Sequence, residues 1–221
     1  MPEMITSHQN PKLKELRKVA RRRDARFLAE GEDLLAAADA AGWEPLERYV
    51  AGVDVEPEAL AKVSTLGSGT RAIAVYEERW APRATGPLCV ALWGVHDPGN
   101  VGTVLRSALA FGATSVAIGP DTADPFGPKA VRASMGAVFS VPLARVTGVD
   151  DLPGETVALV ARAGQPLRGR AEGTLVVGAE RAGLPDEVVS ACDRTAHIPI
   201  ASESLNAAMA ATVALYELTR P

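Results

Sequence analysis

The sequence has few of the residues that build disulfide frameworks or metal sites, and it has no long apolar run. Its two cysteines, Cys89 and Cys192, are far apart and belong to no C-x-x-C pair, so we expect two buried thiols. The three histidines are also far apart and lack zinc-type spacing, so no metal site is expected. No apolar stretch reaches the roughly 18 residues that a membrane span requires.

Other classes are disfavoured by the N-terminus and the overall composition. The opening segment MPEMITSHQNPKLK lacks the apolar core of a secretory signal. Together with the unpaired thiols, this favours a reducing compartment, and we expect a cytoplasmic protein. A hydrophobic content of 47% with a net charge of only −4 excludes a disordered chain.

The small net charge hides an uneven distribution along the chain. Residues 12–26 carry eight Lys and Arg against two acidic residues, a charge of +6, so the remainder carries −10. A basic block of this kind suits a polyanion such as RNA. It also suits the solvated face of an amphipathic helix, because Leu13, Leu16 and Val19 recur at helical spacing. The two interpretations are compatible, since the cations lie on the polar face of that helix.

The chain divides into two α/β parts at a segment rich in proline and glycine. Residues 81–87 (APRATGP) have no periodicity, and we place a boundary there. We assign residues 1–83 to a small α/β domain, 84–87 to a linker and 88–221 to a second domain.

The second domain alternates apolar strands with helices, which predicts a mainly parallel sheet with helices on both sides. The expected strands are 88–95, 115–118, 157–161, 175–178 and 196–200. The expected helices are 101–111, 129–136, 185–191 and 204–218. The last helix is apolar nearly all round, so we expect it in a core or an oligomer interface.

Three segments of this domain follow strands and carry polar residues and glycines. In HDPGNVGTVLRSALAFG (96–112), Asn100 stands at an expected helix N-cap and Arg106 lies two turns further on. In LVVGAERAGL (175–184), a buried strand ends at Gly178 and Glu180 follows. In HIPIASESLNAAMA (197–210), the residues from Ser204 open the last helix. Each segment alone is equally compatible with an ordinary turn or cap.

Together and in this order, the three segments resemble the motifs of the SpoU (TrmH-type) branch of the SPOUT methyltransferases. The matching residues are Asn100, Gly102, Arg106 and Gly112, then Gly178, Glu180, Gly183 and Leu184, and finally Ile198, Pro199, Ser204, Leu205 and Asn206. The stretch 127–142 is similar to the family as well. The segments ITSHQNPKLKEL and RFLAEGEDLL resemble the small RNA-substrate-binding domain that often precedes the catalytic domain.

The resemblance implies an enzyme that transfers a methyl group from S-adenosylmethionine to a ribose 2′-OH of structured RNA. It implies a Rossmann-like catalytic domain with a C-terminal deep trefoil knot, acting as a homodimer through the C-terminal domain and without a metal. Because a small N-terminal domain is present, ribosomal RNA is favoured over transfer RNA.

The resemblance and the charge pattern together assign three sets of site residues. The catalytic set is Asn100, Arg106, Glu180, Ser204 and Asn206. The cofactor-binding set is Ala161, Gly178, Gly183, Ile198, Ile200 and Leu205. The RNA-binding set is Asn10, Lys12, Arg21, Arg22, Arg23, Arg26 and Arg132. We expect Arg106 to orient the 2′-OH and stabilise developing alkoxide, and either Arg106 or Glu180 to accept the proton. Alternatively, Glu180 holds Arg106 in place.

Two other functions remain open from the sequence. Residues 201–203 form a shorter loop than is usual in the family, which leaves a non-catalytic RNA-binding or assembly protein on the same scaffold as an alternative. A dinucleotide-dependent enzyme on an ordinary Rossmann fold is the third hypothesis, and the missing G-x-G-x-x-G after the first strand argues against it.

Overall fold

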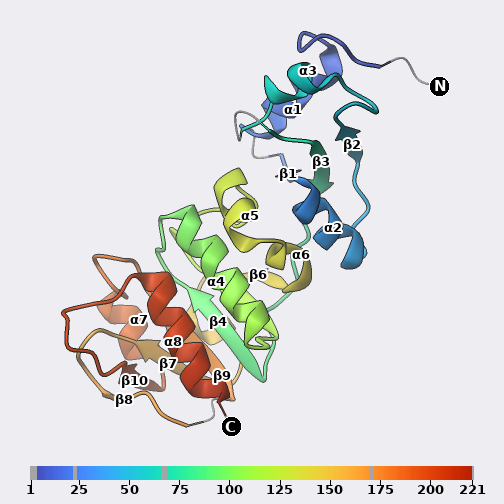
Figure 1. Cartoon of the computed structure of the whole chain (residues 1–221). Helices are drawn as coiled ribbons and strands as arrows, with labels where there is room; N and C mark the ends of the chain where they lie inside the picture. Colours follow the sequence, from blue (N-terminus) through green and yellow to red (C-terminus); the bar gives the residue numbers. More distant parts are fainter. Residues whose placement is uncertain (1–3, 22–23, 66–68, 170–171, 221) are drawn as a thin grey trace.

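The computed structural model describes residues 4–21, 24–65, 69–169 and 172–220, and it contains two β-sheets. A three-stranded sheet belongs to the N-terminal part and a seven-stranded sheet to the C-terminal part (Figure 1). Among the residues described, no helix combines the length and apolar character that crossing a membrane would require.

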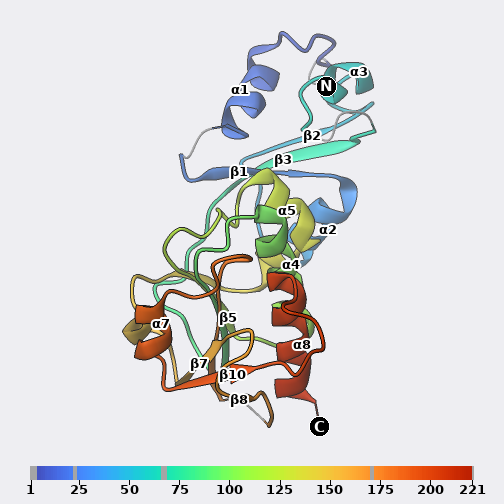
Figure 2. The ribbon, with the colours of Figure 1, turned by 90° about the vertical axis from the view of Figure 1, so that its left-hand side faces the viewer.

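The N-terminal part is a small antiparallel sheet between helices. Its elements are α1 (Pro11–Val19), β1 (Arg26–Glu30), α2 (Glu32–Ala40), β2 (Glu47–Val50), α3 (Pro57–Ala61) and β3 (Ala72–Glu77), with strand order β1-β3-β2. Helices α1 and α3 cover one face of the sheet and α2 lies on the other (Figure 2). The predicted stripe of Leu13, Leu16 and Val19 is buried against the sheet.

The C-terminal part is the parallel sheet that the alternation of strands and helices predicted. Its elements are β4 (Leu88–Leu92), α4 (Pro98–Ala110), β5 (Ser115–Ile118), α5 (Pro128–Ser134), α6 (Ala137–Ser140), β6 (Leu143–Arg145), η1 (Val149–Asp151), β7 (Glu155–Leu159), β8 (Gln165–Pro166), β9 (Gly173–Val177), α7 (Asp186–Ala191), β10 (Arg194–His197) and α8 (Ala207–Thr219). The strand order is β6-β5-β4-β9-β7-β10-β8, and every pairing is parallel. The short elements β6, β8 and α6 were not predicted. The C-terminal knot stays a prediction.

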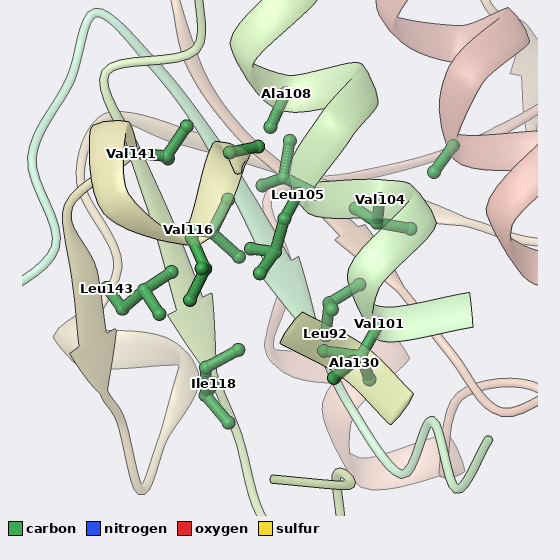
Figure 3. Packing of buried hydrophobic residues seen from close by; sticks show 14 of the residues in the cluster. Leu92, Val101, Val104, Leu105, Ala108, Val116, Ile118, Ala130, Val141 and Leu143 are labelled. Carbon is green, nitrogen blue, oxygen red and sulfur yellow. The ribbon is translucent and has the colours of Figure 1, made fainter. Parts of the chain in front are cut away.

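The central strands of this sheet are buried on both faces, as their continuous apolar sequences indicate. Helices α4 and α8 lie side by side on one face, and α7 covers the opposite face (Figures 1 and 2). Figure 3 shows the apolar side of α4 against β4 and β5, in a contact made by Val101, Val104, Leu105, Ala108, Leu92, Val116 and Ile118.

Close packing of α4 on α5 explains one of the motif glycines. A Cβ atom at Gly102 would lie 2.3 Å from the carbonyl oxygen of Ala130 and 2.9 Å from the backbone nitrogen of Ser134. Because both of these are backbone atoms, any side chain at position 102 would push the two helices apart. Gly102 therefore sets the position of α4, which carries the first motif.

Two helix starts and one thiol differ from the sequence predictions. Helix α4 begins at Pro98, and its N-cap is Asp97, whose carboxylate accepts a 2.7 Å hydrogen bond from the Gly99 N–H, so Asn100 is not the cap. Helix α8 begins at Ala207 with Asn206 as its N-cap, so the helix does not open at Ser204. The two predicted N-caps, Asn100 and Ser204, are wrong because another residue, Asp97 or Asn206, lies at the position where the backbone turns into the helix.

The two thiols differ in burial. Cys89 is buried as predicted, but Cys192 is only half-buried.

A cluster of aromatic side chains joins the two parts of the molecule. The rings pair at centroid distances of 4.9–6.3 Å. They comprise six of the ten aromatic residues in the chain, namely Phe27, Trp43, Tyr76, Trp80, Phe126 and Phe139. The indole N–H of Trp43 also donates a buried 2.8 Å hydrogen bond to the carbonyl oxygen of Phe139. One hydrophobic core thus continues across the expected boundary, and the division into domains stays a prediction.

Phe27 touches four other rings of this cluster, so its removal tests how much the shared core contributes to stability. We expect Phe27→Ala to lower the free energy of unfolding by about 3–5 kcal/mol, because it leaves a cavity between the two sheets. Urea denaturation followed by circular dichroism measures this change. Phe27→Leu is the matched control, with an expected cost below about 1.5 kcal/mol. A cost below about 1 kcal/mol for Phe27→Ala would contradict a contribution of this shared core to stability.

Candidate active site

Three residues from the three motifs meet in one chain of hydrogen bonds. The side-chain amide of Asn100, in the first turn of α4, donates to Glu180 Oε1 at 2.6 Å. Its carbonyl oxygen accepts a hydrogen bond from Nδ2 of Asn206 at 3.1 Å. The Asn206 carbonyl oxygen in turn caps α8 by accepting from the N–H groups of Ala208 and Met209. The first turn of α4, the loop after β9 and the start of α8 are therefore held together at one point.

This chain lies at the edge of a large cavity beyond the carboxyl ends of β7, β9 and β10. The cavity has a volume of about 670 Å³. Such a position is where open parallel sheets bind their ligands. The six predicted cofactor residues all line it, namely Ala161, Gly178, Gly183, Ile198, Ile200 and Leu205. Glu180 and Ser204 line it too, so the cavity brings the second and third motifs together.

The loop after β9 is tightly folded against the cavity. Ala179 and Gly183 exchange backbone hydrogen bonds of 3.1 and 3.0 Å, which closes a short turn that carries Glu180. Gly183 adopts a φ of +70°, which favours glycine. A Cβ atom at Gly178 would lie 2.4 Å from the backbone carbon of Gly183, so only glycine allows the turn to fold back on its own strand.

The segment after β10 presents unused backbone donors to the cavity. Within the described residues, the N–H groups of Ile198, Ile200 and Leu205 donate no hydrogen bond. Buried backbone groups are normally paired, so unpaired donors around a cavity are suited to a ligand with hydrogen-bond acceptors. Apolar side chains from the same residues supply the walls.

Arg106 is not part of the hydrogen-bond chain. It lies exposed on α4, and in the described part of the molecule its guanidinium has neither an ion-pair nor a hydrogen-bond partner. Thr103, between Asn100 and Arg106, bonds back to the Gly99 carbonyl oxygen. The structure therefore brings together Asn100, Glu180 and Asn206, while Arg106 stays available to an incoming ligand.

The predicted RNA-binding residues differ in how their side chains are engaged. Asn10 is the N-cap of α1, accepting from the Lys12 N–H at 3.0 Å, and Arg26 is held in ion pairs with Glu15 and Asp24. These contacts give Asn10 and Arg26 roles within the small domain. Lys12, Arg21 and Arg132 are exposed and lack side-chain partners among the described residues. Arg22 and Arg23 lie outside the described residues.

The start of α4 also carries an ion pair that no motif predicted. Lys129 of α5 contacts the Asp97 carboxylate at 2.7 Å, and this hydrogen bond, with those from the Gly99 and Asn100 backbone, lowers the pKa of Asp97. Asp97 therefore stays ionised and caps α4.

Among the described residues no cluster of three or more His, Cys, Asp or Glu could hold a metal ion.

Sequence reasoning missed several residues that line the cavity. The small ones are Ala163, Gly164, Thr195, Ala207 and Ala210, and the charged ones are Arg181 and Asp186. The alanines and the threonine carry no distinctive chemistry, so no signal in the sequence indicated them. Arg181 and Asp186 lie within and just after the second motif, and this position was the available signal. The reason for Gly164 is visible only in the structure: its φ is +74°, and a Cβ atom there would lie 2.1 Å from the Thr195 carbonyl oxygen.

Comparison with known proteins shows to which family this chain belongs. A model of the SpoU rRNA methylase family matches residues 87–216. The chain belongs to the SpoU rRNA methylase family. The match begins at the proline before β4 and includes all three motifs, but it leaves out the small N-terminal sheet.

Two solved structures of SpoU relatives extend the likeness to the whole chain. An AdoMet-bound rRNA methyltransferase from Sinorhizobium meliloti has a TM-score of 0.86 and 28% identity, covering 98% of this chain and 97% of that one. The SpoU methyltransferase AviRb from Streptomyces viridochromogenes has a TM-score of 0.82 and 26% identity, covering 95% of this chain and 96% of that one. The small N-terminal sheet is thus shared with both structures.

Curated relatives in the SpoU family differ in how much of them this chain covers. The 23S rRNA (guanosine(2553)-2′-O)-methyltransferase RlmP of Bacillus subtilis is 28% identical over 98% of this chain and 99% of its own length. The 23S rRNA (uridine(2479)-2′-O)-methyltransferase of Streptomyces viridochromogenes is 41% identical over 56% of this chain. The matched region spans about half of that protein's length, 49%.

The close approach at Gly178 makes a test of the cavity possible. We expect Gly178→Ala to weaken binding of S-adenosylmethionine by about ten-fold, because the added Cβ pushes the 179–183 turn away from the strand and costs about 1–3 kcal/mol. Isothermal titration calorimetry measures the dissociation constant. Gly148→Ala is the matched control, since a Cβ there meets nothing closer than 4.0 Å and its φ is −141°. Unchanged affinity in Gly178→Ala would place the cofactor elsewhere.

Proposed function

We propose that this protein methylates a ribose 2′-OH of ribosomal RNA, with S-adenosylmethionine as the methyl donor. The observation that carries the proposal is the bridge of Asn100 between Glu180 and Asn206 at the edge of the cavity. Three motifs of a methylase family that are far apart in sequence meet at this point. We further propose that the protein acts in the cytoplasm, because its proposed substrate is ribosomal RNA.

Ribosomal RNA is favoured by the extent of the likeness. The relatives matched over nearly the whole chain include proteins named as rRNA methyltransferases. A structure described as acting on C/U34 of tRNA covers only 59% of this chain, with a TM-score of 0.51. The small N-terminal sheet and its basic helix α1 are the natural candidates for holding a larger structured RNA.

The cavity fits S-adenosylmethionine in size and chemistry. A volume of about 670 Å³ lies within the usual range for cofactor sites. The free N–H groups of Ile198, Ile200 and Leu205 would hold the adenosine part through its nitrogen and oxygen acceptors. Arg181 and Asp186 also line the cavity and would suit the carboxylate and ammonium of the methionine part. The bound cofactor supplies an activated methyl group from a sulfonium.

The polar residues supply the remaining chemistry. The 2′-OH is a weak nucleophile, so positioning and charge stabilisation must provide much of the rate. The Arg106 guanidinium would hold the 2′-oxygen and stabilise negative charge that develops on it. The Asn100 amide fixes the Glu180 carboxylate through its 2.6 Å bond, which leaves the second carboxylate oxygen to accept the proton. Asn206 fixes the orientation of Asn100.

The short loop at residues 201–203 does not remove the third motif from the cavity. Ser204 and Leu205, directly after the loop, both line the cavity, and Asn206 completes the hydrogen-bond chain. The loop therefore gives no structural support to the non-catalytic alternative.

We further propose a homodimer through the C-terminal domain. Large apolar side chains stand exposed along α8 and beside it on α4: Met209 (59%), Val213 (42%), Tyr216 (57%) and Leu109 (46%). The three on α8 are spaced by four and three residues, so they form one stripe. Arg106 lies one turn before Leu109, so a partner covering the stripe would lie next to the catalytic arginine. Sedimentation equilibrium tests this, and a monomer at micromolar concentration would contradict it.

Transfer of label from S-adenosylmethionine to RNA is the decisive test of the function. Purified protein is incubated with methyl-labelled cofactor and with ribosomal or transfer RNA, and labelled 2′-O-methyl nucleosides are mapped in the product. We expect label in ribosomal RNA. Cofactor binding without transfer to any RNA would contradict the proposal and support the non-catalytic alternative.

Arg106→Ala separates the catalytic role of this residue from a structural one. We expect methyl transfer to fall at least about 100-fold, because the developing charge on the 2′-oxygen loses its stabilising cation. The dissociation constant for S-adenosylmethionine should stay within about two-fold, since Arg106 does not line the cavity. Single-turnover kinetics and calorimetry provide the two measurements. Loss of both properties together would show that Arg106 is structural.

A further inference from the structure

A second hollow lies between the two sheets, beside the first turn of α4. Its volume is about 410 Å³. The N-terminal part contributes one wall, from the end of α1 and the start of β1, and the C-terminal part contributes the other. The residues that line it and carry the following argument are Arg21, Phe27, Glu78, His96, Pro98 and Asp124. We call this hollow the interdomain groove.

The acidic groups of the interdomain groove are engaged within the protein. Glu78 accepts a 2.8 Å hydrogen bond from the indole N–H of Trp80 and also faces Arg145 at 3.6 Å. Asp124 accepts a 2.9 Å hydrogen bond from the Phe126 N–H. Arg145 partly offsets the charge of Glu78, whereas Asp124 keeps its negative charge and is held in place by the Phe126 N–H.

Arg26, which also lines the groove, is held in ion pairs with Glu15 and Asp24, but the other two basic groups are not engaged in this way. Arg21 and His96 are both exposed, and neither side chain has a hydrogen-bond or ion-pair partner among the described residues. Arg21 lies in the turn directly after α1, the helix that carries four other cations of the basic block. The groove therefore offers the Arg21 guanidinium, unpartnered within the described part of the chain, together with an apolar wall of partly exposed side chains, Pro98, Ala123 and Pro128.

The groove and the candidate active site share the first turn of α4. Pro98 lines the groove, while Asn100, two residues later, bonds to Glu180 at the cofactor cavity. Two residues of a helix are about 3 Å apart along its axis and point to different sides of it, so the groove and the cavity lie on different sides of the same turn. A strand that crosses this turn with its reacting ribose at the cavity would bring an adjacent nucleotide to the groove.

We infer that the interdomain groove binds the nucleotide next to the methylated ribose, in single-stranded form. This inference rests on the proposed function. Its base packs against the apolar wall, and its phosphate contacts Arg21 and His96. Aromatic and apolar surfaces that accept a base from any sequence, combined with cations along the backbone, are the usual means of holding single-stranded RNA. The ring centroids of Phe27 and Phe126 lie 4.9 Å apart, and this contact fixes the two walls of the groove relative to each other.

Kinetics with single variants of the full chain test this inference. The substrate is a transcript of the ribosomal RNA fragment to which wild-type protein transfers the methyl group. We expect Arg21→Ala and His96→Ala each to raise KM for this RNA about five-fold or more, with kcat within two-fold and cofactor affinity unchanged. Arg21→Ala should also reduce the slope of log affinity against log salt by about 0.7–0.9.

Arg71→Ala is the matched control, because Arg71 is also an exposed cation. It lies directly before β3, whereas Glu78, which lines the groove, lies directly after the other end of this strand. KM values for Arg21→Ala and His96→Ala equal to that of Arg71→Ala would overturn the inference. Failure of wild-type protein to methylate any RNA would instead be a failure of the proposed function.

Cross-linking supplies an independent readout. A 4-thiouridine is placed next to the methylated nucleotide in the same transcript and is irradiated in complex with the wild-type protein. We expect the cross-linked peptides to contain residues 96–98 or 123–128, which line the groove. Cross-links confined to other peptides would contradict the assignment of the groove.

Discussion

The two hydrogen bonds of the Asn100 side chain are the interaction on which the site depends. Its partners, Glu180 and Asn206, are 80 and 106 residues away in sequence. A side-chain amide can donate at one end and accept at the other, which neither a carboxylate nor an apolar group can do. Because Asn206 also caps α8, the same contact links Glu180, the proposed catalytic carboxylate, to the helix that bears the exposed apolar stripe. Chemistry and proposed assembly are therefore coupled through one amide.

The aromatic core holds the small N-terminal sheet in a fixed position relative to this site. Phe27 and Tyr76 of the small sheet pack on Phe139, and Trp43 adds a hydrogen bond to the same segment. Dense packing of this kind resists continuous deformation. The small sheet thus does not act as a loosely tethered module. It presents its cations at one position relative to α4, and this makes a groove shared by both parts suitable for a defined stretch of RNA.

Local signals in the sequence predicted local structure well, and contacts between distant residues poorly. The helical stripe of α1 and the parallel sheet followed from periodicity and alternation, since burial of one helix face or both strand faces leaves a pattern. The meeting of Asn100 with Glu180 was suggested only by the family resemblance, because spacing along the chain carries no information on it. The caps were misplaced because several Asx and Ser residues near each helix start compete for the same role. The aromatic core left no pattern either, because its members, such as Trp43 and Phe139, come from unrelated segments.

The most direct test of this account is the turnover of Asn100→Asp. The new carboxylate cannot donate to Glu180, and its negative charge repels that of the Glu180 carboxylate, so Glu180 loses its fixed position. We expect kcat for methyl transfer to fall about 100-fold or more, with cofactor affinity within about two-fold. A kcat within about three-fold of wild type would contradict the claim that Asn100 positions the proposed catalytic carboxylate.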